Sequence, residues 1–288
     1  MGFEIEETGW ADLHIHTNWS DGVFTADFMV QRAAELGLRA VAITDHDAVR
    51  GALEGLETGK SVGVEVIPGI EMSTSNGIHD VHILGYLFDP THKALLDYIR
   101  FFQEERIRRA HKIIEKLRKM GIRLNADVVI SRAGHGAVGR PHIADALMEE
   151  GFVLSYDEAF YKYIGDGRPA FVEKPKISPA EGMAILHKAG GLCFLAHPGM
   201  DLTEGEIMAV IKQGLDGLEI FHPKHNEDKV NYFYNLAVQN HLLVSGGSDC
   251  HGNRKGEMMM GRYNVPYQFV QDMKQAHARV FPEKQAGQ

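Results

Sequence analysis

Short apolar runs recur along the chain, and segments in which apolar residues return with helical period separate them. Thr25 and Gly37 flank one such segment, in the manner of a helix N-cap and a terminating glycine. Strands that alternate with helices are typical of βα repeats, so the pattern predicts an α/β fold with about seven strands. The predicted strands are residues 10–13, 39–44, 64–67, 81–87, 192–196, 217–221 and 242–245.

The alternation breaks between residues 89 and 168. A highly charged helical pattern spans Lys93 to Met120 and ends at Gly121, and no buried strand pattern follows until residues 169–172. The glycine-rich segment 134–142 lies in this stretch, followed by a predicted helix, and is placed to approach a substrate. We expect a barrel interrupted by a helical insertion, with the first part of the barrel at 1–88, the insertion at 89–168 and the second part at 169–288.

Composition places the chain among ordinary globular proteins. Of its 288 residues, 44% are hydrophobic and 24% charged, which excludes disorder and fibrous folds. No stretch approaches the ~20 apolar residues of a membrane span, and the acidic N-terminus does not resemble a signal peptide. Cys193 and Cys250 are too few for a disulfide framework. We expect a cytoplasmic protein with no membrane partner.

The net charge of the chain bears on whether it binds nucleic acid. Thirty basic against thirty-nine acidic residues give a net charge of -9, so the overall field does not recruit nucleic acid, and no strong DNA binding is expected. Any phosphate group must be held locally. The sixteen histidines are the compositional anomaly, and their positions have to account for them.

Two of the histidines form an alternating pair. On a strand, His14 and His16 share one face, which suits a metal ion, and the same alternation relates Asp249 to His251. Asp45 and His46 are neighbours and face opposite ways on an extended chain. His46 is therefore the predicted ligand. Asp45 either accepts a hydrogen bond from a metal-ligating side chain or caps a helix.

Glu71, His82 and His197 lie in or after strongly apolar runs, where an unpaired charge or imidazole costs several kcal/mol. For any one of them alone, a satisfied core residue or a cap is the better interpretation, and Asp21 alone is typical of a turn. Their joint placement favours a site, because side chains at the carboxyl ends of barrel strands converge on one mouth.

Seven short motifs, in order along the chain, resemble those of the PHP (polymerase and histidinol phosphatase) family. They are Asp12–Thr17, Ser20–Gly22, Ile43–Asp47, Pro68–Glu71, His82–Gly85, Ala196–Pro198 and Ser248–His251. The resemblance implies a distorted seven-stranded (β/α) barrel with a trinuclear metal centre that hydrolyses phosphate esters. It assigns no side-chain base, because a metal-bound hydroxide attacks the phosphorus.

The resemblance also implies the ligands. They are His14, His16, Glu71 and Asp249 for the first ion, Glu71, His82 and His197 for the second, and Asp21, His46 and His251 for the third. Imidazoles mixed with carboxylates suit Mn, Fe or Zn better than Mg or Ca. Three divalent ions with three carboxylates leave about +3 in the pocket, which compensates locally for the negative overall charge.

The insertion after the His82 strand, the segment Gly139–His142 and the segment Glu219–Pro223 most resemble the nucleoside 3',5'-bisphosphate phosphatases of the family. Some of these trim RNA from its 5' end and are called RNase AM. The resemblance implies a nucleotide substrate or short RNA. The candidate substrate residues are Arg140, His142, His222, Lys224 and His225. Arg140 is suited to hold a second phosphate, or else it caps a helix or pairs with Glu149, and Lys224 with His225 alternatively form a solvated loop.

Three other functions stay open on the sequence. A histidinol-phosphate phosphatase shares the metal set but has to recognise an amine. An amidohydrolase also uses an alternating histidine pair, but its site has one late aspartate and a bridging lysine, and here His251 follows Asp249. A non-catalytic, metal-stabilised PHP module is the alternative from another class, and the complete ligand set disfavours it.

Overall fold

The computed structural model describes residues 9–132, 136–254 and 256–282. Gly134 and His135 of the glycine-rich segment lie outside the described residues. Eight strands form one mixed sheet in the order β7-β6-β5-β4-β3-β2-β1-β8. Their bounds are β1 Trp10–Ile15, β2 Ala40–Ile43, β3 Glu65–Ser75, β4 Asp80–Tyr86, β5 Leu192–Leu195, β6 Gly217–Phe221, β7 Leu243–Gly246 and β8 Val265–Pro266.

The sheet departs from the expected seven-stranded repeat in two places. β4 is antiparallel to both β3 and β5, and β8 is antiparallel to β1, whereas the other neighbouring pairs are parallel. A short turn with Gly77 at a φ of 93° joins β3 to β4, and antiparallel strands need no crossover helix. β8 has two residues, too few to show in the apolar pattern.

The sheet curves until the end of β1 meets the chain that leaves β7. Ile15 forms a parallel bridge with Cys250, and the amide of His16 donates to the carbonyl oxygen of Cys250 at 2.9 Å. The result is a nearly closed, barrel-like sheet. The chain that leaves β7 is thereby placed beside the end of β1, where polar side chains gather.

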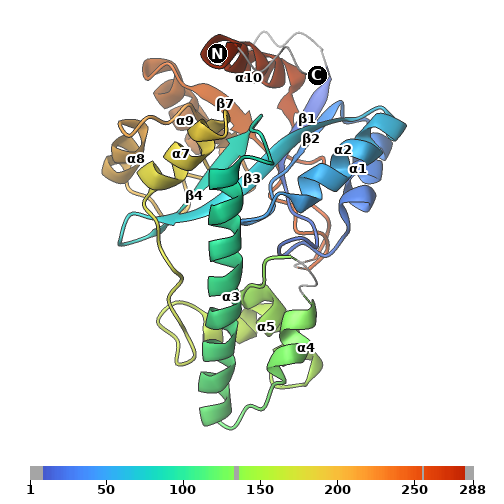
Figure 1. Cartoon of the computed structure of the whole chain (residues 1–288), viewed down its shortest axis with the longest axis vertical. Helices are drawn as coiled ribbons and strands as arrows, with labels where there is room; N and C mark the ends of the chain where they lie inside the picture. The colour runs from blue at the N-terminus through green and yellow to red at the C-terminus, as the bar shows by residue number, and fades with distance from the viewer. Residues whose placement is uncertain (1–8, 133–135, 255, 283–288) are drawn as a thin grey trace.

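Helices cover the outside of this sheet (Figure 1). Thr25 accepts the N-cap hydrogen bond of the first helix from Phe28, and Gly37 follows its end at a φ of 72°, as the sequence predicted. These covering helices are α1 Ala26–Glu35, α2 Arg50–Val62, α7 Pro179–Lys188, α8 Glu204–Ile211, α9 Glu227–Gln239 and α10 Tyr267–Val280. Within the described part of the chain, no helix is long and apolar enough to cross a membrane.

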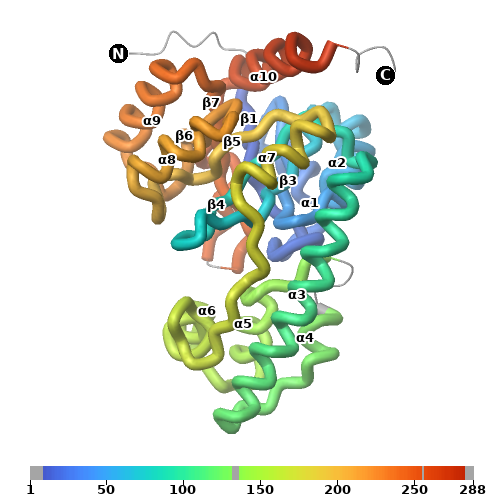
Figure 2. The backbone as a smooth tube through the Cα atoms, turned by 60° about the vertical axis from the view of Figure 1, so that its left-hand side comes forward, coloured from blue at the N-terminus to red at the C-terminus, as the bar shows by residue number. Residues whose placement is uncertain are grey.

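A second group of helices lies below the sheet in the views of Figures 1 and 2. The long helix α3 leaves the sheet and packs there through Ile113 and Leu117 against Ile143 and Leu147, in an apolar cluster separate from those of the barrel. Residues 169–172 form no strand and run beside α3, whose Lys116 donates to the carbonyl oxygen of Phe171. The group comprises α3 Lys93–Lys119, α4 Ala126–Arg132, α5 Arg140–Glu149, α6 Tyr156–Ala159 and the π-helix Phe160–Ile164.

Candidate metal centre

The alternation of β1 brings His14 and His16 together as predicted. Both rings are buried, their centroids are 5.1 Å apart, and the two Nε2 atoms are separated by 3.1 Å. Ile15 between them packs on the other side, among the apolar side chains under α1. Strand alternation therefore places two imidazole nitrogens at one point.

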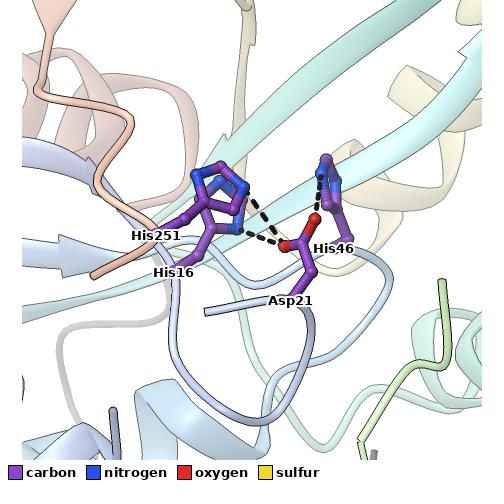
Figure 3. Close-up of side chains that lie close together, drawn as sticks. All are labelled: His16, Asp21, His46 and His251. Atoms are coloured by element: carbon purple, nitrogen blue, oxygen red, sulfur yellow. Dashed lines mark ion pairs between the residues drawn. The ribbon is translucent and has the colours of Figure 1, made fainter. Parts of the chain in front are cut away.

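Asp21 lies at the centre of one cluster (Figure 3). Its carboxylate oxygens are 3.2 Å from His251 Nε2, 3.8 Å from His16 Nδ1 and 3.9 Å from His46 Nε2. One ligand atom from each of the four residues lies within 4.8 Å of the others. The loops after β1 and β7 and the end of β2 thus supply one group that suits a single cation.

Glu71 bridges that cluster to the rest of the centre. Its Oε1 is 2.8 Å from His82 Nδ1 and 3.1 Å from His197 Nε2, while its Oε2 is 3.0 Å from His46 Nδ1. The side chain is 1% exposed. Burial opposes its charge, but the surrounding histidines outweigh burial and hold the pKa of Glu71 well below its usual range.

Asp249 completes the ring around the histidine pair. Its Oδ1 lies 3.2 Å from His16 Nε2 and 3.4 Å from His14 Nε2. Asp249 has a φ of 48° and His197 one of 31°, a backbone region that residues other than glycine seldom adopt. Backbone strain of this kind is often found at functional sites, where the surrounding structure maintains it.

The donor set fits divalent metal ions. Buried nitrogens of His46 and His82 face carboxylates without making a hydrogen bond, as unsatisfied ligand atoms do. Burial disfavours the charge on His16, yet Asp249 and Glu71 raise its pKa to about 10, so that a proton balances the carboxylates. A bound cation can take over that balancing role. Imidazoles with carboxylates are typical ligands of Mn, Fe and Zn.

Glu219 is the site residue to which the sequence analysis gave no role. Its Oε1 accepts from His14 Nδ1 at 2.8 Å, and its Oε2 accepts from the amide of His197 at 2.7 Å. A carboxylate behind a ligating histidine is the usual way of fixing that imidazole. The available signal was a carboxylate inside the otherwise apolar run 217–221.

The carboxylate of Asp45 supports a loop and does not cap a helix. Its Oδ1 accepts from Ser20 Oγ at 2.6 Å and from the amide of Thr17 at 2.7 Å, and its Oδ2 accepts from Thr17 Oγ1 at 2.7 Å. The N-cap of the next helix is Val49, which makes no side-chain cap. Asp45 therefore anchors the loop that carries Asp21.

A cavity of about 660 Å³ lies between the metal centre and the insertion. Arg140 lines it from the first residue of α5, although the sequence placed this residue in a loop. Its guanidinium pairs with Asp166 at 2.5 Å and lies over the rings of Phe160 and Phe171. Arg140 Nη1 also donates to the carbonyl oxygen of Ile164 at the end of the π-helix, at 3.3 Å.

The other four candidate substrate residues lie outside the lining of this cavity, within the part of the chain that the structure describes. His142 accepts from the amide of Gly139 at 3.0 Å. His222 faces Asp249 Oδ2 at 3.4 Å, and its Nδ1 accepts from the amide of Lys224. Backbone groups occupy both ring nitrogens of His225, so this ring has a structural role.

Comparison with known proteins identifies the family. The sequence profile of the PHP domain matches residues 12–128. The chain is 32% identical to the 5'-3' exoribonuclease Rnm of Escherichia coli, over 86% of this chain and 88% of that protein. It is 31% identical to the 3',5'-nucleoside bisphosphate phosphatase of Chromobacterium violaceum, over 87% of this chain and 90% of that protein.

Two solved structures share the whole architecture. A candidate metal-dependent phosphoesterase from Bifidobacterium adolescentis superposes with a TM-score of 0.86 at 30% identity, covering 94% of this chain and 96% of that one. A Chromobacterium violaceum structure described as an amidohydrolase, with bound sulfate and no metal, superposes with a TM-score of 0.79 at 30% identity, covering 86% and 90%. The chain belongs to the PHP family and is a hydrolase of phosphoester bonds.

Proposed function

We propose that this chain removes the 3'-phosphate of nucleoside 3',5'-bisphosphates. The observation that carries the proposal is a single cavity with two chemically different walls. One wall is the cluster of imidazoles and carboxylates, and the other is built from arginines of the insertion and lysines of the segment that follows it. A ligand with two separated phosphates matches both walls. The bound sulfate of the Chromobacterium violaceum structure, a tetrahedral anion, supports the same chemistry.

The proposed ligands are those expected from the family resemblance, with up to three ions of Mn, Fe or Zn. When bound, such ions activate water and neutralise charge on phosphoryl oxygens. The protein contributes the geometry: Glu219 fixes the tautomer of His14, so that Nε2 faces the centre, and Asp45 fixes the loop of Asp21. We keep residues 89–168 as a proposed cap domain between the two barrel segments 1–88 and 169–288.

A second activity, 5'-3' exoribonucleolytic cleavage of short RNA, is favoured by the relative of that name. Histidinol phosphate is a weaker candidate, because its ammonium group would face the cations that line the cavity, Arg109 and Lys174 among them. The same cations oppose a role as an inert module, since a purely structural metal site does not require a cationic wall above it.

A substrate panel tests the proposal. The full chain is reconstituted with Mn, and phosphate release is measured with adenosine 3',5'-bisphosphate and histidinol phosphate, alongside shortening of 5'-phosphorylated RNA. We expect adenosine 3',5'-bisphosphate to give the highest kcat/KM and His16→Ala to give no turnover. Turnover of histidinol phosphate alone would contradict the nucleotide assignment. No turnover of any of the three substrates at full metal loading would contradict the proposal that this chain is an active phosphoesterase on such substrates.

A further inference from the structure

Five cations line the side of the cavity that faces the metal centre from the insertion and its return segment. They are Arg106, Arg109, Arg140, Lys174 and Lys176. Four have a carboxylate partner: Arg106 with Asp47, Arg140 with Asp166, Lys174 with Asp80 and Lys176 with Glu173. Arg109 is the exception among the described residues.

The Arg109 side chain is nearly enclosed and incompletely satisfied. The residue is 6% exposed, and its Nε donates to the carbonyl oxygen of Val172 at 2.7 Å. Its Nη2 is buried and makes no hydrogen bond. An unpaired buried donor on a charged group is costly, and Arg109 lines the cavity, so a ligand that enters the cavity can supply the guanidinium with a further partner.

The surroundings of Arg109 make that partner an anion. Arg106 stands one helical turn away on α3, and Arg140 approaches from α5. Burial, followed by repulsion from Arg140 and Arg106, lowers the pKa of Arg109 to about 9, which leaves the guanidinium charged at neutral pH. Arg106 and Arg140 already have carboxylate partners, so a negative ligand in the cavity would chiefly compensate the charge of Arg109.

We propose that Arg109 is the main anchor of the second phosphate of a doubly phosphorylated nucleotide, with its guanidinium donating to a phosphoryl oxygen. Arg140 assists, because Asp166 already engages its guanidinium. This inference rests on the proposed function and adds a residue that determines specificity. A guanidinium that lines the cavity and has no carboxylate partner among the described residues is suited to a phosphate, which accepts several charged hydrogen bonds.

The test compares two substrates that differ only in the second phosphate. Wild type, Arg109→Gln and Arg109→Lys are reconstituted with Mn, and kcat/KM is measured for adenosine 3',5'-bisphosphate and adenosine 3'-monophosphate. Arg108→Gln is the matched control, because Arg108 directly precedes Arg109 on α3 and is exposed and paired with Glu104. We expect Arg109→Gln to lower the bisphosphate to monophosphate ratio about 10- to 100-fold, mainly through KM.

Arg109→Lys keeps the charge without the planar fork, so we expect a smaller fall in the ratio, and Arg108→Gln should leave it at the wild-type value. Inhibition by the product adenosine 5'-monophosphate should weaken in parallel with the ratio. An unchanged ratio in a folded Arg109→Gln, or equal losses on both substrates, would leave the proposed function standing and overturn the role of Arg109. Wild type that does not hydrolyse the bisphosphate would overturn both.

Discussion

His14 Nδ1 donates to Glu219 Oε1 over 2.8 Å, although 205 positions separate the two residues along the chain. The contact fixes the tautomer of the imidazole and leaves Nε2 facing His16, Glu71 and Asp249. Glu219 is fully buried, and its pKa is lowered because the charge of His14 outweighs the effect of burial. The orientation of His14 Nε2 as a candidate ligand atom therefore depends on Glu219, which contacts the opposite side of the imidazole ring.

Glu219→Gln should weaken metal binding. The amide keeps the shape but loses the charge that makes His14 a stronger ligand, and changes of this kind reduce metal affinity about 10- to 100-fold. Titration of the apoprotein with Mn, followed by calorimetry and by activity, measures the shift, and excess metal should restore much of the turnover. Glu35→Gln is the control, because Glu35 is exposed and paired with Arg32. Equal metal affinity in both variants would contradict the role of Glu219.

His16→Ala and Glu71→Ala should each abolish turnover while the fold is retained. His16 contributes to two of the ligand clusters. Glu71 contacts His46 after β2, His82 in β4 and His197 after β5, so either loss removes more than one contact. Metal content after reconstitution and phosphate release are the measurements, with circular dichroism to check folding. His111→Ala, at an exposed position on α3, should behave as wild type. Wild-type rates in either ligand variant would refute the assignment.

Arg106→Met should destabilise the whole protein. Arg106 Nε and Nη2 lie 2.9 Å and 2.5 Å from Asp47 Oδ2, and Asp47 is completely buried. Removal of one partner leaves a buried carboxylate without its counter-charge, which costs about 3–5 kcal/mol in the free energy of unfolding. Urea denaturation of the apoprotein measures the change. Arg108→Met, which removes only exposed ion pairs, should cost less than about 1 kcal/mol, and similar losses in the two variants would disprove the distinction.

His142 should make the folded state sensitive to mild acid. Burial lowers its pKa to about 4 in the folded protein, against about 6.5 in an unfolded chain. Between pH 6.5 and pH 4 the imidazole of His142 binds a proton in the unfolded chain but not in the folded protein. The contribution of His142 to the free energy of unfolding is therefore fully present above pH 6.5 and falls as the pH drops toward 4. The contribution over this range is about 3 kcal/mol. This pH-dependent contribution should be absent in His142→Gln. If the free energy of unfolding of the two apoproteins changed with pH in parallel, the prediction would be wrong.

Much of the fold was predictable because its signals are local. The alternation at His14 and His16 and the cap at Thr25 act within a few residues, so the sequence alone defined the first strand and the first helix. The hairpin between β3 and β4 was missed, since the turn that replaces a helix there carries a single weak signal, Gly77. The two-residue strand β8 was missed because two residues are too few to show the alternation of apolar and polar positions that predicts a strand.

For the site, the sequence determined which side chains have the chemistry to ligate metal, and only the tertiary structure decided which groups support them. Asp45 and Glu219 are both acidic residues in or beside apolar strands, yet one holds a loop and the other orients an imidazole. Arg140 meets Asp166 because the chain folds back after α5, and Arg109 has no carboxylate partner among the residues that the structure describes. Strand alternation and helix caps depend on neighbouring residues, whereas these pairings depend on the packing of distant segments, which no local pattern encodes.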